Sequence, residues 1–375
     1  MAQDKKRARF VVVFVLFAVY FFGAARPIPL ETVLSPRWIS SLEAGDPVII
    51  DGIAQQLPGV LPFTLGNHFG YVDSAGYFPI NKIKTGNIYL SEKQWVEYDA
   101  EPSKIDIMNV DGETTASIDD PRGYPVLLDN RVFILGSEQN SLSEIDKNGN
   151  ALWTYDFSAP LTCIDAAAGL VLTGSIDGVV EILDLNGRRI FFFEPGGSRF
   201  SVILGCALSS NGLRLGIICG IEDQRFLLLE RYGGASGEYK VIYHEFLDTG
   251  FRRPVHIEFI DQDRRVIFER PLGIGCYNIK SRRGIRIPLN GTIAAIENSG
   301  DQGFLFLICS DSVQQKKLIG IKFPQDRWLP LTVSMRDMIF LEAAFKSDNV
   351  YLNRTGNSIV AGGGATLISF DLEKK

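Results

Sequence analysis

Short apolar runs separated by polar turn residues fill most of the chain. Gly, Asn, Asp and Ser mark the turns and recur about every ten residues, a spacing that predicts short β-strands joined by tight turns. No convincing amphipathic helix interrupts this pattern. The 25 Phe residues against 4 Met agree with sheet packing, because aromatic side chains suit a pleated surface. The chain is therefore predicted to be all-β.

One set of turn and aromatic residues occurs twice with identical spacing. The first copy consists of Gly136, Ser137, Asp146, Asn148, Gly149 and Trp153, and the second, 38 residues later, of Gly174, Ser175, Asp184, Asn186, Gly187 and Phe191. Each copy predicts a strand, a Gly-Ser turn, a strand, an Asp-x-Asn-Gly turn and a strand ending in the aromatic residue. The Asp side chain stabilises such a turn by accepting hydrogen bonds from nearby backbone N–H groups.

The repeat predicts a β-propeller built from four-stranded blades of roughly 40 residues each. The last unit, about residues 338–375, has room for three strands and little of a fourth. An N-terminal segment is expected to supply that strand, because an open blade would leave an unpaired sheet edge. Residues 77–82 would give seven blades, and residues 48–53 would give eight. Seven blades is the favoured number, with eight as the alternative.

The motif Gly-Ser…Asp-x-Asn-Gly-x-x-x-Trp resembles the quinoprotein-type (PQQ-like) propeller repeat, whose strand after the turn carries a docking tryptophan. Residues 207–215, Ala-Leu-Ser-Ser-Asn-Gly-Leu-Arg-Leu, are similar to a WD40-like hairpin. The resemblance is specific in the two copies above, whereas Ile80 and Ala116 replace the aromatic residue elsewhere. It implies the fold more than the function, because propellers host unrelated functions. The chain is similar in repeat type to the outer-membrane-assembly propeller subunit but lacks an N-terminal lipid-attachment cysteine.

The N-terminus has the pattern of an export signal. Four basic residues between Lys5 and Arg9 precede sixteen uncharged residues, 10–25, and Arg26 ends this run. A basic flank before an apolar run directs the following chain out of the cytoplasm. A cleaved signal peptide and an uncleaved signal-anchor helix both fit, and the bulky residues near the end of the run favour the anchor. The predicted domains are 1–26 (signal-anchor or signal peptide), 27–65 (N-terminal extension, a candidate source of the closing strand) and 66–375 (β-propeller).

The net charge bears on the class of partner, and the positions of the cysteines bear on whether they form disulfides. The net charge of −6 argues against a nucleic-acid partner. The five cysteines, Cys163, Cys206, Cys219, Cys276 and Cys309, lie in apolar strand segments, which predicts buried free thiols. A hairpin over Asn211-Gly212 would pair Cys206 with Ile217, so Cys206 and Cys219 would not face each other.

The sequence contains no recognisable catalytic or metal-binding motif. The three histidines, His68, His244 and His256, lack the spacing of metal ligands. Three carboxylates, Asp165, Asp177 and Glu181, are candidates to meet near the axis of a propeller. No catalytic, cofactor-binding or metal-binding residue is predicted, and the sequence favours a protein without enzymatic activity.

The arginine-rich region 252–286 is the candidate partner-binding region. Residues 251–290 hold nine Arg and Lys against four acidic residues, and the candidates are Arg252, Arg253, Arg282 and Arg283. The resulting hypothesis is a membrane-tethered or exported propeller, outside the cytoplasm, that binds envelope or membrane proteins and contacts the membrane through residues 10–25. The alternative is an enzyme or small-molecule sensor that uses the central channel, as quinoprotein or lyase propellers do.

Overall fold

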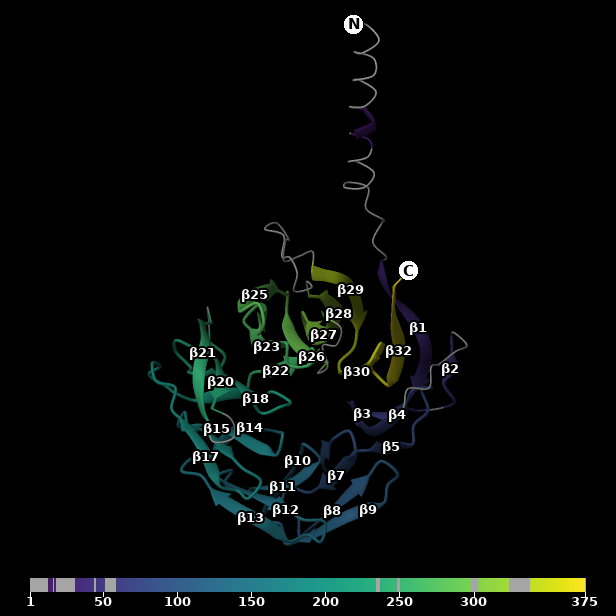
Figure 1. The fold of residues 1–375 in the computed structure, drawn as a ribbon. Coiled ribbons are helices and arrows are strands. Elements are labelled where there is room, and N and C mark those ends of the chain that lie inside the picture. Colours follow the sequence, from purple (N-terminus) through teal and green to yellow (C-terminus); the bar gives the residue numbers. More distant parts are fainter. Residues whose placement is uncertain are drawn as a thin grey trace, which may run out of the picture. The chain divides into compact units, whose positions relative to one another are not determined.

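β-Strands and the short turns that join them form nearly all of the chain that the computed structural model describes (Figure 1). The described residues are 13–15, 17, 31–43, 45–50, 59–233, 237–247, 250–297, 303–323 and 338–374. They form eight antiparallel sheets, and the compact unit of residues 36–371 contains strands of all eight. The prediction of an all-β propeller is confirmed. The preferred number of seven blades is wrong, because the sheets are eight.

Blades are numbered here in chain order, starting with the blade that joins the two ends of the propeller. Blade 1 contains β30 (Val350–Thr355), β31 (Ser358–Gly363), β32 (Thr366–Lys374), β1 (Thr32–Ser41) and β2 (Val48–Ile49). Blade 2 contains β3 (Val60–Leu65), β4 (His68–Asp73) and β5 (Ile80–Ile83). Blade 3 contains β6 (Asn87–Leu90), β7 (Gln94–Tyr98), β8 (Lys104–Asn109) and β9 (Thr114–Asp119).

The other five blades have four strands each and follow one another along the chain. Blade 4 contains β10 (Gly123–Leu128), β11 (Arg131–Gly136), β12 (Ser141–Ile145) and β13 (Ala151–Asp156). Blade 5 contains β14 (Leu161–Ala167), β15 (Leu170–Ser175), β16 (Val180–Leu183) and β17 (Arg189–Phe193). Blade 6 contains β18 (Ile203–Leu208), β19 (Arg214–Cys219), β20 (Arg225–Tyr232) and β21 (Glu238–Phe246). Blade 7 contains β22 (Ile257–Ile260), β23 (Arg265–Arg270), β24 (Gly273–Asn278) and β25 (Arg283–Pro288), and blade 8 contains β26 (Thr292–Ile296), β27 (Phe304–Ser310), β28 (Gln315–Lys322) and β29 (Ile339–Lys346).

Strands within a blade are lettered a to d from the centre outward, and the a strands of neighbouring blades contact one another. Because neighbouring strands are antiparallel, the a–b and c–d turns lie on one face of the propeller, called the c–d face here. The b–c turns and the connections to the next blade lie on the opposite face, called the d–a face. Bonds between blades agree with this division: Ser210 in one a–b turn donates to Asp263 in the next.

The fourth strand of blade 1 is β1, which is neither of the two segments expected to close the propeller. β1 lies beside β32, and Arg37 Nε donates to Asp371 Oδ2 over 2.7 Å. Residues 77–82 instead contribute to β5 of blade 2, and Val48–Ile49 pair with the outer side of β1. Taking the closing strand from upstream of residue 42 leaves residues 60–83 free to build a separate blade, which raises the number to eight.

The repeated turns have the structure that their residues predict. Asp146 Oδ1 accepts the N–H groups of Asn148 and Asn150 over 2.8 and 2.9 Å, and Asp184 Oδ1 accepts those of Asn186 and Arg188 over the same distances. Gly149 and Gly187 have positive φ of 84° and 70°, a conformation that a side chain disfavours. These turns are the c–d turns of blades 4 and 5.

The core lies between neighbouring blades, where apolar side chains of adjacent sheets interdigitate. Phe226 of blade 6 stacks on Phe268 of blade 7 with ring centroids 4.1 Å apart, and both rings are buried. Phe191 of blade 5 contacts Tyr239 of blade 6 with centroids 5.0 Å apart. Burial of one such side chain stabilises the fold by about 1.5–3 kcal/mol, so these contacts hold the blades in a fixed order.

The predicted N-terminal hydrophobic helix of residues 10–25 falls largely outside the described residues. Val13–Val15 and Phe17 are helical and exposed. Within the part of the chain that the structure describes, no helix has the length and apolar character needed to cross a membrane. The anchor therefore stays a prediction from the sequence.

Candidate functional site

The two arginine pairs singled out in the sequence lie on opposite faces of the propeller. Arg252 and Arg253 belong to the connection between β21 and β22, on the d–a face. Arg282 and Arg283 belong to the c–d turn of blade 7 and the start of β25, on the c–d face. The structure therefore does not combine the four residues into one surface, and each face has to be considered separately.

On the d–a face, arginines lie beside exposed apolar side chains. Arg253 pairs with Glu269 through two bonds of 3.0 and 2.5 Å, and its guanidinium lies 4.6 Å from the centroid of Phe251. The side chains of Phe200, Phe246 and Leu272 are 46, 50 and 77% exposed. Aromatic residues and arginine are enriched at protein interfaces. We call the surface formed by Phe200, Phe246, Arg252, Arg253 and Leu272 the aromatic–arginine surface.

The loops that carry this surface are fixed by a buried glutamine. Gln224, only 1% exposed, donates from Nε2 to the carbonyls of Gly220 and Phe251 and accepts the N–H of Phe251 at Oε1, over 2.8 to 3.1 Å. Ser198 Oγ donates to the carbonyl of Glu222 over 2.5 Å. The connections on either side of blade 6 are thus tied to its b–c turn by hydrogen bonds next to Phe200, Arg252 and Arg253.

A groove of about 560 Å³ opens between blades 6 and 7 on the c–d face. It is lined by side chains of β19, β20, β21 and β24, of both a–b turns and of the c–d turn of blade 7, and these are Asn211, Arg214, Glu230, Tyr232, Ile242, Gln262, Asp263, Arg264, Tyr277, Ile279, Lys280 and Arg282. Arg282 is the only one of the four predicted arginines that lines it among the described residues. We call it the cationic groove.

Near the axis, ionisable side chains from several a strands influence one another. Burial raises the pKa of Glu258 on β22 to about 8, and the nearby carboxylates of Asp165 and Glu297 add to this effect. Burial also raises the pKa of Asp165, although the carboxylate accepts the N–H groups of Leu208 and Ala166. Glu297 pairs with Arg354 over 3.3 Å, and both side chains are fully buried. This cluster of three carboxylates and one arginine joins four blades.

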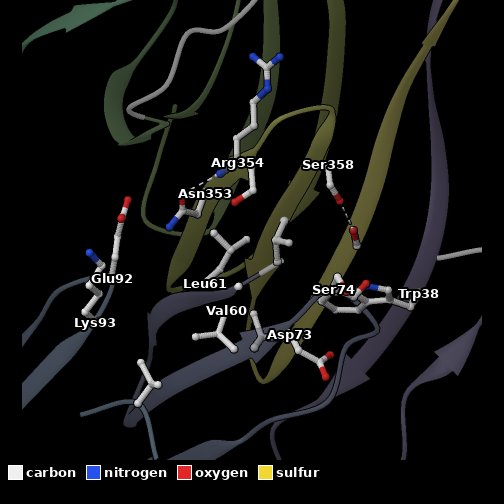
Figure 2. A pocket seen from close by; sticks show the side chains of 16 residues that line it. Trp38, Val60, Leu61, Asp73, Ser74, Glu92, Lys93, Asn353, Arg354 and Ser358 are labelled. Carbon is white, nitrogen blue, oxygen red and sulfur yellow. Dashed lines mark hydrogen bonds between the residues drawn. The ribbon is translucent and has the colours of Figure 1, made fainter. Parts of the chain in front are cut away.

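A pocket of about 410 Å³ lies among blades 1, 2 and 3 on the c–d face (Figure 2). Val60, Leu61 and Val72 supply apolar walls, and Asn353 and Ser358 supply polar groups. The asparagine is bound locally, since Asn353 Oδ1 accepts the N–H of Arg354 over 2.7 Å. The pocket therefore has the mixed lining typical of small-molecule sites.

The other carboxylates and histidines from the sequence do not join the axial cluster. Asp177 lies in the b–c turn of blade 5 beside Ser175, and Glu181 on β16 pairs with Arg189 over 3.2 Å. The histidines occupy separate blades: His68 contacts Asn81, His244 packs on Phe246, and His256 lies 3.7 Å from Glu258. Burial lowers the pKa of His256. In the described residues, no group of three or more His, Cys, Asp or Glu side chains is arranged to hold a metal ion.

Comparison with known proteins decides the family. A model of the family described as β-propeller protein matches residues 1–375. The chain belongs to this β-propeller family. The propeller is 26% identical over 302 residues to an uncharacterised protein of Treponema pallidum (strain Nichols), and the match covers 79% of each chain.

Two solved structures share the fold of the propeller. BamB from Moraxella catarrhalis superposes with a TM-score of 0.55 at 12% identity, covering 90% of this chain and 100% of that one. The computationally designed Ika8 protein superposes with a TM-score of 0.56 at 12% identity, covering 86 and 98%. At this identity the likeness concerns the fold.

Sequence reasoning missed most residues that build the propeller's surfaces. Leu272 gave a usable signal, because a leucine between Pro and Gly is expected to lie in a tight turn, where a side chain has few packing neighbours. Gln224, Glu258 and Glu297 gave none, since their importance depends on neighbours from other blades. The same holds for Arg214, which lines the cationic groove with residues more than 60 positions further along the chain.

Proposed function

We propose that the propeller is a non-catalytic protein-interaction platform of the cell envelope, and that its aromatic–arginine surface is the docking site. The observation that carries the proposal is the exposure of Phe200, Phe246 and Leu272 on the same face as Arg252 and Arg253, where Gln224 and Ser198 tie the connections on either side of blade 6 to its b–c turn. A rigid surface of this composition loses little conformational entropy on binding. Its complement is a protein segment with acidic side chains next to apolar ones.

Two features of the sequence support the envelope location. The basic residues before residue 10 and the uncharged run 10–25 form an export pattern, and the repeat is similar in type to that of an envelope propeller. Protease accessibility of the tagged full chain in spheroplasts, where the cytoplasmic membrane is intact and any outer barrier is opened, tests this location. Complete protection of the propeller in spheroplasts, with digestion after lysis, would contradict it.

The docking surface is tested by affinity capture of partners with the full chain from membranes. We expect the double variant Arg252→Glu/Leu272→Asp to abolish capture of the partner. The first substitution reverses a charge, and the second places a charge in the apolar contact. Arg283→Glu is the matched control, since it reverses an exposed arginine on the opposite face. Equal capture by the two variants would refute the assignment.

A second candidate function is a small-molecule sensor in the central region. It is favoured by the convergence of Asp165, Glu258 and Glu297 from three blades and by the pocket in Figure 2. Thermal unfolding of the full chain with Ca²⁺, a quinone cofactor or sugars tests it, because a ligand that binds the folded state raises the unfolding temperature. Absence of any shift with these ligands would argue against the sensor.

A further inference from the structure

Two of the cysteines come together between blades 5 and 6. Cys163 belongs to β14, the innermost strand of blade 5, and is partly exposed. Cys206 belongs to β18, the innermost strand of blade 6, and is buried. Both side chains belong to one apolar cluster, which fills the space between the two blades.

The strands that carry the two cysteines are joined at two points. Thr162 Oγ1 on β14 donates to the carbonyl of Ile203 on β18 over 2.5 Å. Further along the same strands, Asp165 Oδ2 accepts the N–H of Leu208 over 2.6 Å. Both cysteines lie between these bonds along their strands, so the bonds hold them at matching heights.

A glycine on β15 leaves the space that the Cys163 side chain occupies. Gly174 pairs with Cys163 across the sheet, and a Cβ on Gly174 would come within 2.7 Å of Cys163 Sγ and 2.4 Å of Ile203 Cγ2. Because both atoms lie beside the same point, the Cys163 thiol lies at the boundary between the blades, next to the strand that carries Cys206.

The two thiols also interact with each other. A hydrogen bond with the Cys163 thiol, together with burial, raises the pKa of Cys206 well above its ordinary value. Cys219 is in the same apolar cluster, but its thiol interacts with Arg225 at the start of β20, while burial raises its pKa. The contact between thiols therefore singles out Cys163 and Cys206.

We infer that Cys163 and Cys206 form a reversible disulfide that joins blade 5 to blade 6 under oxidising conditions. A disulfide needs Cβ atoms about 3.5–4.5 Å apart, so it forms without backbone movement only between side chains that are already in contact. The bond would stabilise the propeller mainly by restricting the unfolded chain between the two residues. This site does not depend on the docking function proposed above.

The reaction is a thiol–disulfide exchange, with a disulfide such as oxidised glutathione as the oxidant. The partly exposed Cys163 loses its proton and attacks one sulfur of the oxidant, whose S–S bond breaks and releases one glutathione thiolate. The Cys206 thiolate then attacks Cys163 Sγ in the mixed disulfide and releases the second glutathione. The two cysteines lose two protons and two electrons, and the oxidant gains them as two molecules of reduced glutathione. The second step is the slower one, since only the thiolate attacks and the pKa of Cys206 is raised.

The test treats the full 375-residue chain, purified in its reduced form, with oxidised glutathione below the unfolding temperature. Peptide mapping by mass spectrometry after blocking of free thiols should show a Cys163–Cys206 cross-link. The unfolding temperature should rise by about 5 °C, and reduction should reverse the rise. Cys206→Ala should stop the reaction at a mixed disulfide of Cys163 with one glutathione and show no such rise. Cys276→Ala is the matched control, since Cys276 is buried in blade 7, and it should still form the cross-link.

Four results would overturn the proposal. In the first, neither cysteine reacts, or Cys163 of the native chain retains glutathione without forming the cross-link. In the second, Cys206 links to Cys219, or the disulfide joins two chains. In the third, oxidation raises the unfolding temperature of Cys206→Ala as much as that of the native chain. In the fourth, the cross-link forms without any rise in the unfolding temperature, which would assign it to unfolded chains.

Discussion

The indole of Trp38 lies against Gly76, and its Nε1 donates to the carbonyl of Ser74 over 2.9 Å. A Cβ on Gly76 would come within 2.7 Å of the indole ring, so the contact needs a glycine. Trp153 has the same relationship to Gly187, where a Cβ would lie 2.5 Å from the ring. In both cases an aromatic residue of strand d packs on the turn before the last strand of the next blade, which is β5 for Trp38 and β17 for Trp153. Trp38 therefore marks β1 as an ordinary fourth strand.

The first prediction concerns this aromatic–glycine contact. Gly187→Ala should lower the free energy of unfolding by about 2 kcal/mol or more, because the methyl group both clashes with Trp153 and is strained at a φ of 70°. Gly196→Ala is the control, since no atom lies within 4 Å of its added Cβ. Chemical denaturation of both variants measures the difference. Equal stability of the two would show that Trp153 does not pack on the turn.

Local patterns were sufficient to predict the blades but not their closure. The Asp146 and Asp184 turns and the Trp153 contact follow from residues within one or two repeats, and each was recognisable from spacing. The pairing of β1 with β32 joins residues such as Arg37 and Asp371, more than 300 positions apart. No local pattern specifies a partner at that distance. Trp38 was the available signal, since it precedes Gly76 much as Trp153 precedes Gly187.

Candidate sites were harder to predict for the same reason. Arg252 and Arg282 are close in sequence and of one chemical type, yet the strands of blade 7 carry them to opposite faces. Glu258 and Asp165 are distant in sequence, yet the carboxylate of Asp165 adds to the rise in the pKa of Glu258 near the axis. In a propeller, the place of a residue within its blade decides which side chains it meets. That place depends on where each strand begins and ends, and these boundaries follow from the pairing between strands.

The second prediction concerns the Asp-capped turns. The N–H groups of Arg188 and Asn186 hold the pKa of Asp184 below its ordinary value of 3.8. Asp184→Ala should destabilise the propeller by about 1 kcal/mol through loss of these bonds, whereas Asp184→Asn should cost less because its Oδ1 still accepts them. The stabilisation by the ionised Asp184 side chain is present above this ordinary pKa and is lost as the pH falls. The stabilities of the native chain and of Asp184→Asn should therefore converge in acid. Denaturation at neutral and acidic pH checks both points.

The third prediction concerns the buried pair Glu297–Arg354, which connects blades 8 and 1. Arg354 also donates to the carbonyl of Phe304 over 3.1 Å. Arg354→Met should destabilise the fold by about 3–5 kcal/mol, because it leaves a buried carboxylate without its partner. Adding Glu297→Gln should recover part of this loss. A double-mutant cycle measured by denaturation gives the coupling, and strictly additive effects would contradict a direct interaction.

The fourth prediction concerns the pH dependence of stability caused by Glu258. Its pKa in the folded state is about 8 against an ordinary value of 4.5, so between these values the folded chain binds more protons than the unfolded chain. Stability contributed by this group is therefore greatest below about pH 4.5, falls as the pH rises, and levels off above pH 8. The Glu258 side chain is 31% exposed, so the free energy of unfolding should fall by about 2 kcal/mol over this pH range, less than for a fully buried carboxylate.

Glu258→Gln should remove this dependence, because the neutral amide imitates the protonated acid at every pH. At pH 9 the variant should be more stable than the native chain, and at pH 5 the two should be nearly equal, as judged by denaturation midpoints. Glu138→Gln is the control, since it removes an exposed carboxylate in the b–c turn of blade 4. If Glu258→Gln and Glu138→Gln shift the midpoint equally at both pH values, Glu258 is not held in its neutral form by burial and by the carboxylates of Asp165 and Glu297, and the axial cluster has no special electrostatic character.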